Sequence, residues 1–216
     1  MYITYLLLVI TILVSVKAMN DENWKRRLMF NPYDVVHNKK WYRSFTHAFI
    51  HADYMHLGFN MYVLYMFGAG IVPKDGYIAS HYSLEPTLIL DHGAKGYLYF
   101  ACLYVGGILF STLISLARHR DNPGYNSLGA SGAVSAVVFG YIIMNPMAEL
   151  GILFIPFYIP AFIFGPLILV FEYYMAKRGG TGIAHDAHLA GAIFGILFMA
   201  AIDYHYIIDF FSKFTS

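Results

Sequence analysis

Long apolar segments constrain this sequence more than any other feature. Six of them occur, and most approach the length of about 20 residues that a helix needs to cross a bilayer. Hydrophobic residues make up 58% of the chain and charged residues only 12%, roughly half the charged fraction of a soluble domain. The sequence therefore predicts an all-α, polytopic membrane protein that forms a single domain over residues 1–216. Its helices are expected at residues 2–18, 54–72, 97–117, 128–144, 150–175 and 183–202.

The segments around these helices carry further expectations. Residues 19–46 are polar and rich in aromatic residues and arginine, which suits an element at the membrane interface. Residues 74–96 form a polar connection to which the sequence assigns no function. Pro156, Pro160 and Pro166 predict kinks in the fifth helix rather than a straight rod. The first apolar segment has no positive residue before it and no small-residue cleavage site after it, so we expect an uncleaved helix.

Polar residues gather at one end of three predicted helices. The second, fourth and sixth helices cross the membrane in the same direction, so their N-terminal ends share one face. His56 and Asn60 lie at that end of the second helix, and Ser131 begins the fourth. His185 and His188 lie in the first two turns of the sixth. Ionisable groups in membrane helices are costly and face the bundle interior or a cavity, so this gathering indicates a site.

Ser131 stands in the small-residue step Gly129-Ala130-Ser131-Gly132, where a polar loop turns into an apolar helix. The glycines leave space around the hydroxyl, and the backbone N–H groups of a helix start are unpaired. These donors and the positive end of the helix dipole would stabilise an oxyanion if Ser131 attacked a carbonyl. The alternative interpretation is structural, since serine among small residues often marks close packing of membrane helices.

Small residues also recur every fourth position on two helices, giving each of them one smooth face. If these faces meet, Ser131 and His188 lie at the top of the same seam, where a neutral histidine can activate the hydroxyl. His56 and Asn60 share a helix face and could donate to an oxyanion. The arrangement is a serine–histidine dyad with no third carboxylate evident. The small residues are Gly132, Ala136 and Gly140 on the fourth helix and Ala187, Gly191 and Gly195 on the sixth.

The sequence resembles the rhomboid family of intramembrane serine proteases in three motifs. They are WYRSFTHAFIHADYMHLGFN at residues 41–60, the step at Gly129–Gly132 and AHLAG at residues 187–191. The resemblance implies a six-helix bundle that hydrolyses peptide bonds within or at the edge of a substrate's membrane helix. It implies Ser131 as the nucleophile and His188 as the general base, with an oxyanion hole formed by His56, Asn60 and the Ser131 N–H.

The resemblance also implies supporting residues, and the sequence departs from it in places. Arg43 matches the family's first-loop element, and His47 and His51 match histidines with structural roles; Gly129 and Gly132 support the nucleophile. The tryptophan–arginine pair of that loop reads Tyr42-Arg43. Ser135 occupies a position where some bacterial members carry an aromatic residue against the catalytic histidine, so the orientation of His188 is left open. His185 is an alternative base one turn before His188.

Other functions were weighed against an intramembrane protease. A rhomboid-like pseudoprotease would bind membrane clients without cleavage, but such proteins typically lose the serine or the histidine. A transporter using the histidines as a proton relay would place polar groups near mid-bilayer. A metal-dependent protease lacks a His-Glu-x-x-His motif, and His185 and His188 have no evident third ligand. An aspartyl protease needs two facing carboxylates, and the helices offer chiefly Glu172.

The partners and orientation follow from these arguments. We expect no metal and no cofactor. The expected partners are transmembrane protein substrates that approach from the lipid bilayer beside the fifth helix. We expect no nucleic-acid partner, because the net charge is only +1. The sequence leaves the oligomeric state open. The family resemblance places the protein in a prokaryotic plasma membrane with the site facing outward. The positive-inside rule favours the reverse, since loops on the site's face carry eleven Lys/Arg and the opposite face carries three.

Overall fold

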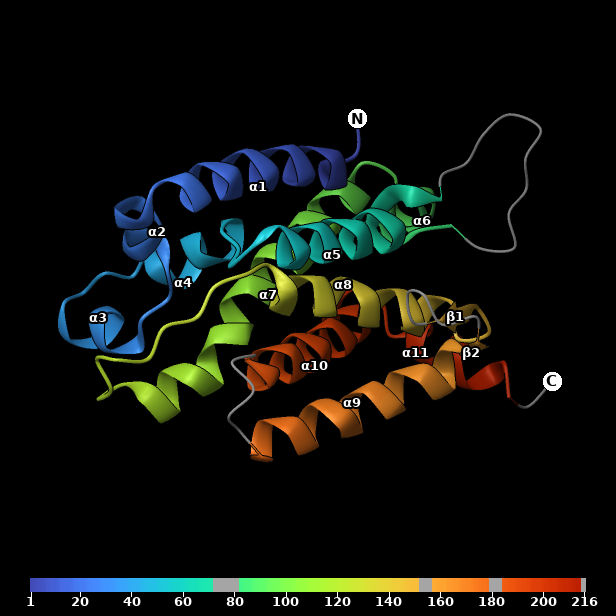
Figure 1. Ribbon diagram of the computed structural model, residues 1–216. Helices are drawn as coiled ribbons and strands as arrows, with labels where there is room; N and C mark the ends of the chain where they lie inside the picture. The colour runs from blue at the N-terminus through green and yellow to red at the C-terminus, as the bar shows by residue number, and fades with distance from the viewer. Residues whose placement is uncertain (72–81, 152–156, 179–183, 215–216) are drawn as a thin grey trace.

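The computed structural model describes residues 1–71, 82–151, 157–178 and 184–214 (Figure 1). Helices dominate these residues, and their strands form one short antiparallel hairpin. The elements in chain order are α1 (Ile3–Asn20), α2 (Glu22–Leu28), α3 (Pro32–His37), α4 (Arg43–Thr46), the 3₁₀ helix η1 (His47–Phe49), α5 (Tyr54–Tyr65), the π-helix η2 (Met66–Gly70), α6 (Leu84–His92), α7 (Lys95–His119), α8 (Ser131–Met144), β1 (Glu149–Gly151), β2 (Tyr158–Pro160), α9 (Ala161–Arg178), α10 (His185–Ile202) and α11 (His205–Ser212).

The predicted all-α, polytopic membrane bundle is confirmed. Within the described ranges, α1, α7 and α10 are long and apolar enough to cross a membrane, and α8 is a shorter apolar helix. The other two predicted segments correspond to α5 with η2 and to α9. Most positions of α8 are buried, whereas the outer helices expose many large apolar side chains, as lipid-facing surfaces do.

The predicted helix over residues 150–175 is wrong at its start. Residues 149–151 pair with residues 158–160 in the β1–β2 hairpin, with Leu150 opposite Ile159, and the helix begins only at Ala161. Proline lacks the backbone N–H that a helix interior requires, so Pro160 fits the position just before the first turn. Pro166 remains inside α9, whereas Pro156 lies outside the described residues.

The predicted helix over residues 54–72 is not continuous either. The α-helix ends at Tyr65 and passes into η2, where Ala69 has non-helical angles of φ −151° and ψ 24°. Gly68 lies against α1, and a Cβ there would stand 2.6 Å from Thr4 Oγ1. The end of this helix therefore depends on its contact with α1. A prediction from the hydrophobic period of the segment alone cannot detect such a contact.

The segment at 74–96 also gains an element that the sequence did not predict. Its described part contains α6, whose Glu85 is fully buried. The Glu85 carboxylate accepts hydrogen bonds from the Ile3 N–H at 2.6 Å, the Thr4 N–H at 2.9 Å and Thr4 Oγ1 at 2.7 Å. Two of these donors are free backbone N–H groups in the first turn of α1. Glu85 of α6 therefore caps the N-terminus of α1 from a distant part of the chain. Burial raises the pKa of Glu85 above its usual range.

The first loop, residues 19–46, forms the three short helices α2, α3 and α4. It is joined to the loop before Ser131 by a pair of backbone bonds between Phe30 and Ser127, at 2.9 and 3.0 Å. The Asn31 side chain adds bonds to the carbonyl oxygens of Pro123 and Tyr125, both at 3.0 Å. The first loop therefore fixes the segment that leads into α8.

Figure 1 shows α8 in the middle of the bundle, with α5 on one side and α10 on the other. The N-terminal ends of α5, α8 and α10 lie at the end of the bundle that carries α2, α3 and α4, as the alternation of helix directions predicts (Figure 1). The start of α1 and the helix α11 lie toward the opposite end (Figure 1). The polar residues at these three helix starts are thereby brought to one level.

Candidate active site

The Ser131 and His188 side chains meet across the start of two helices. Ser131 is the first residue of α8, and His188 lies in the first turn of α10. Ser131 Oγ is 2.7 Å from His188 Nε2, and both side chains are only partly buried. This is the hydrogen-bond length at which an imidazole can accept the hydroxyl proton.

Glycines make this approach possible. A Cβ on Gly191 would collide with the carbonyl group of Gly132, and a Cβ on Gly195 would collide with the carbonyl oxygen of Ala136. The backbones of α8 and α10 are therefore in direct contact, as the small-residue spacing predicts. Gly132 also faces α7, because a Cβ there would collide with the Ser111 side chain.

Gly129 shapes the turn that presents the serine. Its φ of +116° lies in the region that favours glycine. A Cβ there would also stand 2.7 Å from Cε1 and 2.9 Å from Nε2 of His56, whose ring lies over this backbone. The turn explains why α8 begins at Ser131 rather than at residue 128, where the sequence placed its start.

The two N–H groups before the nucleophile are held by His47 and His51, which lie between the first loop and α5. The Gly129 N–H donates to the His47 carbonyl at 2.9 Å, and the Ala130 N–H donates to His51 Nε2 at 3.3 Å. The other ring nitrogen of His51 lies 2.9 Å from Ser15 Oγ, which donates to the Phe49 carbonyl at 2.9 Å. These contacts tie the turn to η1 and α1; the structural roles that the resemblance implied for the His47 and His51 side chains stay a prediction.

His47 and His51 are both kept neutral by their surroundings. Burial lowers the pKa of His47 to about 4. Burial, with a smaller contribution from the neighbouring His56, lowers the pKa of His51 to about 3. His47 Nδ1 is 3.1 Å from the Arg43 carbonyl, so a neutral ring donates there. Neither ring contacts a carboxylate in the described residues, which leaves them as supports rather than bases.

Arg43 anchors the first loop from inside. Its guanidinium is buried and lies 3.0 Å from Asp34 Oδ2, and it also donates to the Met29 carbonyl at 3.4 Å. Burial would raise the pKa of Asp34, but hydrogen bonds from Asn38 and Lys40 and the nearby Arg43 charge outweigh it and lower the pKa below its usual range. Arg43 therefore lies in the first loop, where it holds α4 to α3.

The two expected oxyanion donors are adjacent on α5. Asn60 is buried, and its Nδ2 donates to the His56 carbonyl at 2.9 Å, which leaves a second amide N–H. The His56 ring lies over Gly129 and packs edge-on against His51, with ring centroids 4.9 Å apart. Their contribution to an oxyanion hole stays a prediction.

A carboxylate stands beside the dyad, contrary to the expectation that none is present. Glu172 of α9 is 86% buried as a side chain, and its Oε1 lies 3.2 Å from His188 Nδ1. Its Oε2 lies 2.6 Å from Nδ1 of His185, so one carboxylate bridges both histidines. Glu172 lies in the last two turns of α9 and His188 in the first turn of α10, so the antiparallel pairing of these neighbouring helices places them at one depth. That pairing was the signal in the sequence that could have revealed the contact.

The same contacts correct the expectation that His185 and His188 lack a third metal ligand. The ligand atoms of Glu172, His185 and His188 all lie within 4.8 Å of one another, so they could converge on a cation. Here both Nδ1 atoms face the carboxylate directly, at hydrogen-bond distance. The carboxylate and the two Nδ1 atoms are therefore paired with one another.

A second carboxylate, Asp186 of α10, faces α7 and not the dyad. Asp186 is buried, and Ser115 Oγ of α7 donates to its Oδ2 at 3.0 Å. The Arg118 guanidinium lies 3.9 Å from the same oxygen. Asp186 therefore fixes the start of α10 against α7, whereas Glu172 fixes it against α9.

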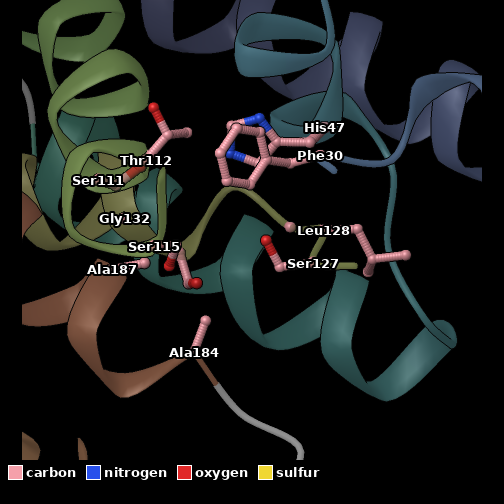
Figure 2. Close-up of a pocket in the computed structure, with 12 residues that line it drawn as sticks. Phe30, His47, Ser111, Thr112, Ser115, Ser127, Leu128, Gly132, Ala184 and Ala187 are labelled. Carbon is pink, nitrogen blue, oxygen red and sulfur yellow. The ribbon is translucent and has the colours of Figure 1, made fainter. Parts of the chain in front are cut away.

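A small polar cavity of about 20 Å³ lies beside the nucleophile, enough for about one water molecule. Figure 2 shows the rings of Phe30 and His47 on one side of it, and Ala184, just before α10, and Ala187 of α10 on another. Its polar lining comes from His47, Ser111, Thr112, Ser115, Ser127 and Ser131.

Comparison with known proteins agrees with this arrangement. The family model described as the rhomboid domain matches residues 38–204. The chain belongs to the rhomboid family. RHOMBOID-like protein 12, mitochondrial, from Arabidopsis thaliana is 30% identical over 173 residues, which cover 73% of this chain and 45% of the relative. Presenilin-associated rhomboid-like protein A, mitochondrial, from Danio rerio is 29% identical over 159 residues, covering 70% and 35%.

This rhomboid chain spans less than half the length of these curated relatives. The human presenilin-associated rhomboid-like protein, mitochondrial, gives the same picture, with 28% identity and coverage of 70% and 35%. These rhomboid relatives are mitochondrial by name, so they give no support to the expected prokaryotic plasma membrane. The rhomboid match itself makes the chain a multi-pass membrane protein.

Proposed function

We propose that this protein is an intramembrane serine endopeptidase that hydrolyses peptide bonds in or near the transmembrane helices of membrane-protein substrates. The contact that carries the proposal is the 2.7 Å hydrogen bond between Ser131 Oγ and His188 Nε2. Membership of the rhomboid family supports the same reaction class. The single domain over residues 1–216 belongs to this proposal as well.

The reaction follows from the roles of the side chains. His188 Nε2 takes the Ser131 proton while Oγ attacks the scissile carbonyl carbon, and the same proton then passes to the leaving amine. The Ser131 N–H at the start of α8 and donors from His56 and Asn60 stabilise the oxyanion. Water then hydrolyses the acyl-enzyme, and the polar cavity beside Ser131 provides a place for it. No metal or cofactor takes part in this proposal.

Substrate helices approach from the lipid beside α9. Only Ala161 and Gly165 are buried among the described side chains of α9, and Phe171, Tyr173 and Tyr174 are exposed by half or more. This helix therefore exposes an apolar surface at the edge of the bundle and also reaches the dyad through Glu172. We place the site toward the outer face of its membrane, following the family, although the basic loops favour the reverse.

A cleavage assay tests the proposal. The purified protein in detergent is given a fluorogenic transmembrane peptide, and Ser131→Ala is compared with Ser135→Ala, one turn later on the same helix. We expect Ser131→Ala to abolish cleavage and Ser135→Ala to keep it, with no effect of a chelator. A fluorophosphonate probe should label the parent protein at Ser131. Equal cleavage by the Ser131→Ala protein would end the proposal, and an inert parent protein that still binds membrane helices would favour the pseudoprotease.

A further inference from the structure

We propose that Glu172 is a positioning residue for His188, and that His185 holds Glu172 in place. The inference rests on the proposed function and deepens it. The sequence expectation was a dyad, with nothing assigned to orient the imidazole. The structure places a largely buried carboxylate on the ring nitrogen that faces away from Ser131.

The carboxylate selects the tautomer that the reaction needs. An ionised carboxylate only accepts hydrogen bonds, so Nδ1 of His188 carries the proton where it faces Glu172 Oε1 at 3.2 Å. Nε2 then has a free lone pair, and Ser131 Oγ can donate to it at 2.7 Å. The opposite tautomer would leave the carboxylate without that donor and would set an N–H against the serine proton.

The same carboxylate stabilises the ring after it has taken the proton. An imidazolium at His188 would lie beside a negative charge in a site where water is scarce, which strengthens their attraction relative to bulk water. The carboxylate therefore acts on the charged ring that forms during attack. This effect concerns turnover rather than substrate binding.

His185 explains why Glu172 stays in reach. Its Nδ1 lies 2.6 Å from Glu172 Oε2, a shorter contact than the one to His188. The His185 side chain is buried, and within the described residues its Nε2 has no hydrogen-bond partner. The hydrogen bonding of this ring is thus directed at Glu172. His185 is an anchor for the carboxylate and not a second base.

Glu172 belongs to the peripheral helix, so the orientation of the base depends on α9 lying against α10. Pro166 lies between the buried part of α9 and Glu172, and its missing N–H interrupts the helix hydrogen bonds at that point. The half of α9 that carries Glu172 is joined to α10 through these polar contacts and through the edge-on contact of the Phe171 and His185 rings. Displacing it would remove the carboxylate from His188.

The first test reads the tautomer directly and needs no activity. The imidazole ¹⁵N spectrum of His188, assigned by comparison with His188→Gln, is recorded in detergent before and after a chelator is added. We expect the Nδ1–H tautomer in the parent protein. Glu172→Gln should shift it toward Nε2–H, because the amide can donate to Nδ1. A parent spectrum that changes on adding the chelator would overturn the inference, since a metal would then hold Nδ1.

The second test is kinetic, with Asp186→Asn as the matched control. This control variant removes the buried carboxylate of Asp186 on α10, which faces α7 instead of the dyad. Glu172→Gln should lower kcat on the order of 10²- to 10⁴-fold, the range seen when a base is held in the wrong tautomer, with KM within about twofold. Glu172→Asp should recover part of it. Asp186→Asn should lower the unfolding temperature and leave the pH dependence of kcat unchanged.

His185 variants complete the test. His185→Leu removes the anchor and should lower kcat about tenfold, in the range that loss of an outer hydrogen bond produces. His185→Gln keeps a donor and should retain more activity. If the parent protein is active and Glu172→Gln and Asp186→Asn change kcat equally, the inference about Glu172 is overturned and the proposed function is not. An inactive parent protein whose His188 tautomer still depends on Glu172 would overturn only the proposed function.

Discussion

The histidines on the two sides of the Ser131 turn have different kinds of partners. On the first-loop side, His51 accepts from a backbone N–H and contacts the Ser15 hydroxyl, and His47 faces a backbone carbonyl. On the α10 side, His185 and His188 share a carboxylate. All four were candidates from the sequence. Their partners, rather than their residue type, separate the two groups.

The difference has a chemical consequence. A ring that accepts an N–H on one nitrogen and is buried among neutral groups is stabilised in its uncharged form, which agrees with the pKa of His51 near 3. A ring between a hydroxyl and a carboxylate can gain a proton on one nitrogen without losing the bond on the other. The first arrangement supports a backbone turn, and the second suits a base.

The largest expected effect is the loss of turnover when the base on the α10 side is replaced. His188→Gln should lower kcat/KM by at least about 10³-fold, because the nucleophile loses its base, while the unfolding temperature changes little. A peptide-cleavage assay and thermal unfolding in the same detergent measure the two quantities. If His188→Gln kept most of the activity and His185→Gln lost it, the roles of the two α10 histidines would have to be exchanged.

Much of the fold could be predicted because its signals are local. Apolar segments gave the bundle, alternation of helix direction placed three helix starts at one level, and the small-residue spacing gave the contact of Gly132 with Gly191. These patterns depend only on helix period and span length. They were sufficient to predict that Ser131 and His188 lie at the top of the same seam.

The missed features arise from contacts between distant segments. The hairpin before α9, the π-helix against α1 and the capping of α1 by Glu85 each depend on a neighbour far along the chain. Glu172 was noted in the sequence only as a lone carboxylate. Its pairing with His188 depends on how α9 and α10 meet, which no property of either helix alone determines.

An intermediate effect concerns His51 and the pH dependence of stability. Its folded pKa of about 3 lies below the ordinary histidine value of about 6.5, so the unfolded chain binds a proton that the folded protein does not. The stabilisation is present above about pH 6.5 and is lost as pH falls toward 3. Each such group steepens the loss by about 1.4 kcal/mol per pH unit.

Replacing that ring should therefore flatten the pH profile. His51→Gln should unfold at a lower temperature than the parent protein at pH 7.5, and the difference should shrink by pH 5. Activity should fall several-fold, because the Ala130 N–H and the serine turn are less well held. The measurement is thermal unfolding across this pH range. If the unfolding temperature of His51→Gln changed with pH as steeply as that of the parent protein, His51 would already carry a proton in the folded state.

The smallest expected effect lies farthest from the dyad, at Asp34. Asp34→Asn removes the charge facing Arg43 and should lower the free energy of unfolding by about 1 kcal/mol at pH 7, because the asparagine amide oxygen can still accept a hydrogen bond but the opposite charge is lost. The folded pKa of Asp34 is lowered, so its contribution is present above the unfolded value and disappears as pH falls through the folded one. Parent and variant should thus converge in acid. Turnover at neutral pH should change less than about twofold, because the first loop has further bonds through Phe30 and Asn31. A loss comparable to that of His51→Gln would mean that Arg43 governs the serine turn directly.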